Sequence, residues 1–177
     1  MVDYINTTGP TAAVPAVAPA PAVAPAPAVP AFPGGYNGKI LRVNLSAGTT
    51  STEALTEQFC RKWLGGAGFV AYYLWKELKQ GVDALGPDNK LIFAVGPISG
   101  LLLPGAARNC IGAKSPLTGG IAKSECGGFW GAELKRAGFD AIIIEGKAEK
   151  PVYLWVHDGE VSIRDAAHLW GKDTLET

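Results

Sequence analysis

Proline spacing divides this chain more sharply than any other feature of its sequence. From Pro10 to Pro33 a proline recurs every two to five residues, mostly among alanine and valine. Each proline fixes φ and removes a backbone N–H, which disfavours helices and central strands. Such tracts favour extended polyproline II without a packed core. We therefore expect a disordered leader or linker over residues 1–35 and a globular domain over residues 36–177. An alternative role for the leader is a docking arm for a partner subunit.

Charge and cysteine content exclude several classes of function. The chain balances 16 basic against 16 acidic residues, so no net field attracts nucleic acid or an anionic membrane. Proline interrupts the apolar stretch from Thr11 to Phe32, which argues against a signal peptide and a membrane helix. The three cysteines, Cys60, Cys110 and Cys126, lack the spacing of a zinc or cluster site. We expect a cytoplasmic protein with no nucleic-acid or membrane partner.

Beyond the leader, the hydrophobic pattern predicts a folded domain. Leu41, Val43 and Leu45 alternate with polar residues, as in a half-buried strand. Asp158-Gly159 separates two strand-like runs and signals a hairpin. Several strands, few helices and many glycine turns indicate an α+β fold. The predicted strands cover residues 39–45, 91–95, 109–113, 120–123, 141–145, 152–157 and 160–164; the predicted helices cover about 56–81, with a break at 65–68, and 129–137, and a further helical segment begins at Trp170.

Glycine is densest between residues 96 and 131, a stretch that holds nine of them. Glycine lets backbone N–H groups approach a ligand closely. Arg108 and Lys114 add positive charge here, and Gly127-Gly128 precede a helix N-terminus, which attracts anions. This pattern predicts a flat wall for a phosphorylated cofactor, although a sheet with tight turns and surface cations explains it equally. The Gly65–Gly68 run falls inside a helical pattern, where we expect no phosphate loop, and no Rossmann G-x-G-x-x-G run follows a strand.

Longer blocks of the sequence resemble one family. Lys114-Ser-Pro-Leu-Thr-Gly119 and Gly127-Gly-Phe-Trp-Gly-Ala-Glu-Leu-Lys135 are similar to hallmark segments of the aldehyde:ferredoxin oxidoreductases. The resemblance covers essentially the whole chain from Tyr36 onward and leaves out the proline-rich leader. Further blocks in the order and spacing of the family are Gly38-Lys-Ile-Leu-Arg-Val-Asn-Leu45, Trp63-Leu-Gly-Gly66, Gly138-Phe-Asp-Ala-Ile-Ile-Ile-Glu-Gly-Lys-Ala148 and residues 165–171.

The resemblance implies a fold and a cofactor. In the family this domain consists of two β-sheets with packed helices, and it forms a base for a bis-pterin complex of tungsten or sometimes molybdenum. Arg108 matches an arginine that contacts a pterin, and Gly127, followed by Gly128, matches a backbone contact to the cofactor. Glu125 stands where the family often has an asparagine whose carbonyl binds a Mg²⁺ bridging the two pterin phosphates. Cys126 lies beside this wall as a near neighbour of the cofactor.

The resemblance also implies a reaction and its partners. Members oxidise small aldehydes to carboxylic acids and pass electrons through a [4Fe–4S] cluster to ferredoxin or an iron–sulfur subunit. The cluster ligands would lie beyond residue 177, so we expect a truncated domain that is inactive without a C-terminal remainder, within a possible homo-oligomer. Ala67 replaces an arginine of many members, so a second basic contact is missing. Alternatives are a hydroxy acid or aromatic thioester as substrate, and a non-catalytic small subunit or assembly scaffold.

Overall fold

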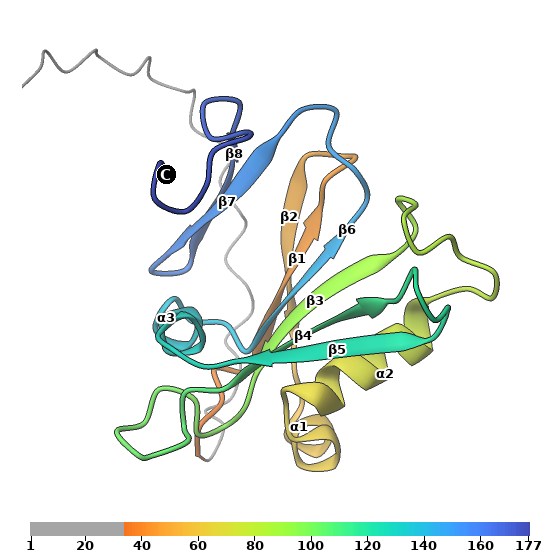
Figure 1. Ribbon diagram of the computed structural model, residues 1–177. Coiled ribbons are helices and arrows are strands. Elements are labelled where there is room, and N and C mark those ends of the chain that lie inside the picture. Colours follow the sequence, from red (N-terminus) through yellow and green to blue (C-terminus); the bar gives the residue numbers. More distant parts are fainter. Residues whose placement is uncertain (1–33) are drawn as a thin grey trace, which may run out of the picture.

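The computed structural model describes residues 34–177, which form a main sheet, a separate hairpin and three helices (Figure 1). Residues 1–33, which make up nearly all of the predicted leader, lie outside the described part of the chain. The strands are β1 (Lys39–Asn44), β2 (Thr49–Ala54), β3 (Lys90–Val95), β4 (Asn109–Lys114), β5 (Ile121–Cys126), β6 (Ala141–Glu145), β7 (Val152–His157) and β8 (Glu160–Asp165). The helices are α1 (Glu57–Trp63), α2 (Ala67–Glu77) and α3 (Trp130–Arg136).

The main sheet has the strand order β2-β1-β6-β3-β4-β5, and β7 pairs with β8 in a second, two-stranded sheet. β1 and β6 run parallel, while the other neighbours in the main sheet are antiparallel. The predicted α+β fold with two sheets and packed helices is therefore confirmed. The apolar runs predicted as strands at residues 91–95 and 141–145 occupy the centre of the main sheet, as expected for strands buried on both faces.

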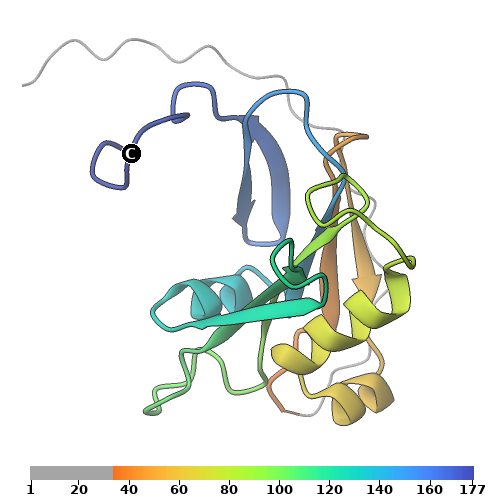
Figure 2. The same ribbon diagram turned by 45° about the vertical axis from the view of Figure 1, so that its right-hand side comes forward.

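Both faces of the main sheet are covered by other elements. α1 and α2 lie against one face, whereas α3 and the β7–β8 hairpin lie against the other (Figures 1 and 2). Strand alternation sets this division, because Ile40 belongs to the core beneath α2, whereas Leu41 and Val43 pack in the core beneath α3 and the hairpin. Phe69 and Tyr73 of α2 fill the first core. None of the helices in the described part of the chain is long and apolar enough to cross a bilayer.

The structure differs from the sequence prediction at four places, of which the first is that α2 ends at Glu77 rather than at residue 81. The hydrophobic pattern does not predict β2, because every residue of Thr49–Ala54 except Ala54 is polar. Its threonines are β-branched, which suits a strand paired with β1. β5 extends to Cys126 rather than Lys123, so Glu125 lies in a strand. The helical segment expected from Trp170 consists of turns, so that prediction was wrong.

A buried carboxylate joins the start of β1 to the turn before β6. Asp140 is fully buried, and it accepts hydrogen bonds from two backbone N–H groups, the closer being that of Gly38 at 2.7 Å. Lys135 Nζ of α3 lies 2.5 Å from Asp140 Oδ1 and supplies the opposite charge. The Asp140 backbone N–H donates to the Lys39 carbonyl at 2.9 Å, and its carbonyl accepts from the Val95 N–H at 3.0 Å. This one residue therefore fixes β1, β3 and α3 relative to one another.

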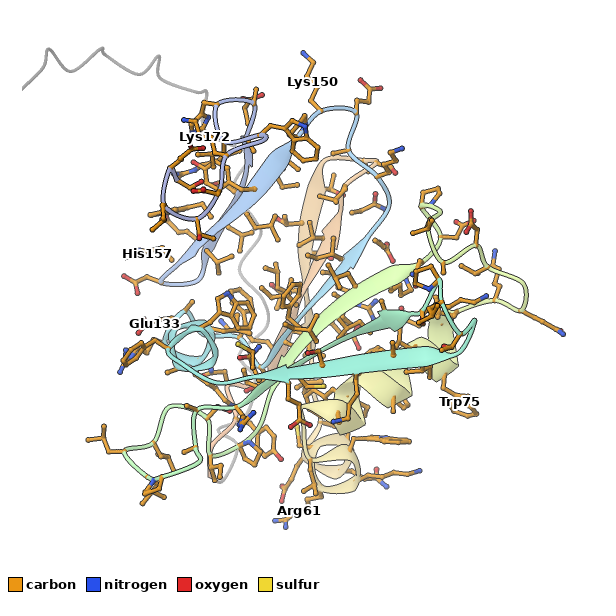
Figure 3. All side chains as sticks on the ribbon, viewed as in Figure 1. Arg61, Trp75, Glu133, Lys150, His157 and Lys172 are labelled. Carbon is orange, nitrogen blue, oxygen red and sulfur yellow. The ribbon has the colours of Figure 1, made fainter. Side chains whose placement is uncertain are left out.

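Replacing Asp140 with alanine should lower the free energy of unfolding by about 3 kcal/mol or more, because it removes the buried counter-charge of the Lys135 ammonium and leaves two N–H groups without their acceptor. Urea denaturation followed by tryptophan fluorescence measures this change. The control is Glu57→Ala, which removes the partner of the exposed Arg61 that points away from the molecule in Figure 3. An exposed pair contributes below about 1 kcal/mol. Equal losses in the two variants would contradict a special role for Asp140.

Candidate functional site

Three parts of the chain meet at the end of the main sheet where β3 ends and β4 begins. They enclose a cleft of about 240 Å³, which we call the Arg108 pocket. The α1–α2 loop, both ends of the β3–β4 loop and one residue of β5 line it. The lining residues are Leu64, Gly65, Gly66, Ala67, Gly96, Pro97, Ile98, Ser99, Gly105, Ala106, Arg108, Asn109, Cys110 and Glu125.

The N-terminus of α2 opens at this pocket. The predicted break in the helix is confirmed, since Gly65 has φ 117° and a Cβ there would lie 2.5 Å from the Val95 carbonyl oxygen. The Gly66 N–H donates to that carbonyl at 3.1 Å. Gly66 is the N-cap of the 11-residue α2 and offers no side chain to the N–H groups of the first turn, of which that of Gly68 donates to the Gly65 carbonyl at 3.0 Å. The positive end of the helix dipole therefore lies at the pocket, ready for an anion.

Arg108 brings a full positive charge to the same place. Its side chain is exposed, and its guanidinium forms no ion pair or side-chain hydrogen bond with any of residues 34–177. Glu125 also lines the pocket and forms an ion pair with Lys123 at 2.5 Å. The hydrogen bond from Lys123, and to a smaller extent the charge of Arg108, hold the pKa of Glu125 below its ordinary value. The pocket therefore presents an available guanidinium beside a carboxylate that is already paired.

The site residues predicted from the sequence separate into two groups. Arg108 and Glu125 line the pocket, whereas Cys126, Gly127 and Gly128 are not among its lining residues. These last three are exposed and follow Glu125 directly along the chain, at the end of β5. The structure thus brings Arg108 and Glu125 together and leaves the other three residues on the adjoining surface.

Strand alternation explains this separation. Glu125 pairs with Cys110, which is buried in the core beneath α2, so Glu125 shares the α2 side of the sheet. Cys126 pairs with Asn109, whose Cβ would lie 3.3 Å from a Cβ placed on Gly131 of α3. The α3 side also holds a buried acceptor, because Asn109 Oδ1 has no hydrogen-bond partner within the described residues.

Other candidate groups have structural roles. Lys114 donates from Nζ to the Val82 carbonyl and from its backbone to Asn89 Oδ1, which fixes it to the loop before β3 instead of the pocket. Burial raises the pKa of the Cys60 thiol to about 11 and also raises that of Cys110, so neither thiolate forms readily. Within residues 34–177, no three His, Cys, Asp or Glu side chains gather closely enough to hold a metal ion.

The combined geometry suits a phosphate attached to a flat ring. The α2 amides and Arg108 both attract negative charge. Glycine keeps the walls open, since a Cβ on Gly105 would meet nothing within 4 Å and one on Gly66 would meet only Cys110 Cβ, at 3.9 Å. The residues present are therefore compatible with the phosphate of a pterin cofactor.

Sequence reasoning missed the Gly65–Ala67 wall. The sequence predicts the break at residues 65–68, but the apolar periodicity on either side of it led us to expect a bend in a helix rather than part of a pocket wall. A usable signal was present, because three glycines in the four residues from Gly65 to Gly68 end a helix and expose the amides of the next one.

Residues 40–177 match the family described as aldehyde ferredoxin oxidoreductase, N-terminal domain. The chain belongs to this family. The chain is 57% identical to the tungsten-containing aldehyde ferredoxin oxidoreductase of Pyrococcus abyssi over 143 residues, and this alignment covers 81% of the chain and 24% of the relative. It is 43% identical to the aliphatic sulfonate oxidoreductase, WOR-like subunit, of Pyrococcus furiosus over 144 residues. This alignment covers 80% of the chain and 23% of that protein.

Among solved structures, the chain is similar to the active site complex BamBC of benzoyl coenzyme A reductase in complex with 1,5-dienoyl-CoA. The TM-score is 0.78 and the sequence identity is 39%, over 81% of this chain and 22% of that chain. The chain thus spans about a quarter of the length of the relatives that it matches.

Replacing Glu125 with glutamine should raise the affinity of the chain for inorganic pyrophosphate roughly two- to fivefold at low salt, because it removes a negative charge from the pocket and releases Lys123. Isothermal titration calorimetry measures the dissociation constant. The matched control is Glu133→Gln on α3, an exposed carboxylate that does not line the pocket and lies on the opposite face of the sheet from α2 (Figure 3). No gain from Glu125→Gln, or an equal gain from the control, would argue against an anion site at the Arg108 pocket.

Proposed function

We propose that this chain is the cofactor-holding N-terminal part of a tungsten-pterin enzyme that oxidises aldehydes to carboxylic acids. The observation that carries the proposal is the meeting of Arg108 with the open N-terminus of α2 in one pocket. Family membership supports it, as does the 57% identity to a relative that is named a tungsten-containing aldehyde ferredoxin oxidoreductase. Domain boundaries at residues 36–177, with residues 1–35 as a separate leader, are part of the same proposal.

Each candidate residue has a role in holding a bis-pterin of tungsten or molybdenum. Arg108 and the first-turn amides of α2 would bind phosphate and orient the pterin. The main-chain carbonyl of Glu125 would serve a Mg²⁺ between the pterin phosphates, and its carboxylate is tolerable there because Lys123 already pairs with it. Cys126 and the Gly127-Gly128 turn would contact the cofactor from the α3 side, beside the unpaired acceptor described above.

When bound, the tungsten complex would supply two-electron exchange with the substrate, in a reaction that takes an aldehyde and water to a carboxylic acid, two protons and two electrons. The residues of this chain contribute binding, orientation and charge. They do not fit a [4Fe–4S] cluster, since Cys60 and Cys110 are buried core residues and Cys126 is exposed. Cluster ligands would come from a C-terminal remainder of the kind that the longer relatives possess, and electrons would pass on to ferredoxin or an iron–sulfur subunit.

The same domain fits other substrate classes. The likeness to a benzoyl coenzyme A reductase complex favours an aromatic thioester as the second candidate, because a shared fold does not fix the substrate. A hydroxy acid is a further candidate substrate. A non-catalytic small subunit or assembly scaffold is the alternative from a different class. We further propose a cytoplasmic enzyme, which suits three free cysteines, and a homo-oligomeric state.

Replacing Arg108 with alanine should weaken binding of neopterin monophosphate, a fluorescent pterin phosphate, roughly tenfold or more, because charge-assisted hydrogen bonds to phosphate are lost. The affinity of Arg108→Lys should fall between those of wild type and Arg108→Ala, since lysine keeps the charge without the planar guanidinium. Fluorescence anisotropy gives the dissociation constants. The control Arg136→Ala removes an exposed arginine of α3 that is paired with Glu133. Unchanged affinity in Arg108→Ala would contradict the assignment of the Arg108 pocket as the pterin-phosphate site.

The native protein provides the test of the whole proposal. Protein purified from its source after growth with tungstate should contain tungsten and should reduce a viologen dye when an aldehyde is added. Activity with an aromatic thioester or a hydroxy acid in place of an aldehyde would select one of the other substrate classes. Tungsten- and molybdenum-free protein without dye reduction would favour the scaffold.

A further inference from the structure

The loop between β3 and β4 is long, and the apolar side chains at its tip are exposed. Residues 96–108 extend beyond the sheet at the lower left of Figure 1 and contain no helix or strand. Leu101, Leu102 and Leu103 are each more than half exposed, so the tip of the loop has no apolar anchor within the described residues. Both ends of this loop nevertheless line the Arg108 pocket. The position of Arg108 at its C-terminal end therefore depends on what closes the base of the loop.

A single hydroxyl group spans that base. The side chain of Ser99 is buried, and its Oγ accepts a hydrogen bond from the Gly96 N–H at 3.0 Å and donates one to the Arg108 carbonyl at 3.1 Å. The last residue pair of the β3–β4 ladder is Val95 with Asn109. Ser99 therefore joins the residue that follows β3 to the residue that precedes β4, and it extends the connection one step beyond the ladder.

The remaining backbone hydrogen bonds of the loop do not reach Arg108. Gly100 donates to the Ala106 carbonyl at 3.1 Å, and the other bonds join residues two or three apart. The Arg108 guanidinium forms no hydrogen bond or ion pair with any of residues 34–177. Its location in the pocket is consequently set by its backbone, and the Ser99 hydroxyl is the side-chain group that holds that backbone.

We propose that Ser99 is a positioning residue for pterin-phosphate binding, which it supports by holding the backbone of Arg108 at the mouth of the pocket. This inference rests on the proposed function, because it assigns the ligand of Arg108 to the pterin phosphate. A guanidinium whose backbone is fixed before binding loses less freedom when it meets a phosphate. Removing the hydroxyl takes away the hydrogen bonds of the Gly96 N–H and of the Arg108 carbonyl. The C-terminal end of the loop then becomes more mobile, and the affinity for the pterin phosphate falls.

The test compares Ser99→Ala with Ser99→Thr, which retains the hydroxyl, in the full 177-residue chain. Ser115→Ala is the matched control, because Ser99 and Ser115 are both 8% exposed and Ser115 Oγ likewise accepts backbone hydrogen bonds in a turn, but away from the pocket. Neopterin monophosphate is the probe, titrated by fluorescence anisotropy. Each serine variant is also combined with Arg108→Ala, and amide hydrogen exchange of residues 96–108 is followed without ligand.

Ser99→Ala should weaken binding roughly three- to tenfold and speed exchange of the Gly96 amide, while Ser99→Thr and Ser115→Ala stay within about twofold of wild type. In the Arg108→Ala background, Ser99→Ala should cause no further loss, because its effect acts through Arg108. Wild-type affinity in Ser99→Ala, or an equal loss in both backgrounds, would overturn the inference and leave the proposed function standing. Equal affinity of wild type and Arg108→Ala would overturn the proposed function itself, and the positioning role with it.

Discussion

The buried pairing of Asp140 with Lys135 and two backbone N–H groups is the constraint on which the rest of the domain depends. Through its backbone, Asp140 accepts a hydrogen bond from the Val95 N–H, and the Val95 carbonyl in turn accepts one from the Gly66 N–H. Two successive hydrogen bonds thus connect a charge in the interior to the N-terminus of α2. The pocket is therefore built on the most buried polar group of the domain, although its own walls are irregular loops.

α2 is held at its other end by charge. Glu77 lies 2.6 Å from Arg42 Nη2 and 3.2 Å from Lys90 Nζ, both on strands of the main sheet. Burial alone would raise the pKa of Glu77, but the hydrogen bonds from these two cations outweigh it and leave the pKa lowered. The helix is thus tied to the sheet at both ends, by a backbone hydrogen bond beside the pocket and by ion pairs at the far end. A helix fixed in this way can present its first-turn amides at a constant position.

The sequence predicts most elements of this fold because their signals are local. Alternation in β1, unbroken apolar runs in β3 and β6, and the Asp158-Gly159 turn each depend on a few neighbouring residues. The sequence does not predict β2, because this mostly polar segment becomes a strand through pairing with β1 and shows no apolar periodicity. The pocket is harder to predict, since Gly65, Arg108 and Glu125 are far apart in sequence and meet only through the strand order. The family resemblance points to Arg108 and Glu125, whereas the hydrogen bonds of Ser99 to Gly96 and Arg108 are visible only in the folded structure.

β5 is the last strand of the main sheet within the described residues, and all of its side chains are exposed. An edge of this kind offers unpaired N–H and C=O groups to any other extended chain. The Lys123–Glu125 pair on this strand places two charges where a flat apolar edge would invite aggregation. Because ions screen exposed charges, concentrated salt weakens this protection. The ionic strength of the buffer is therefore a determinant of whether the isolated domain remains dispersed during purification and concentration.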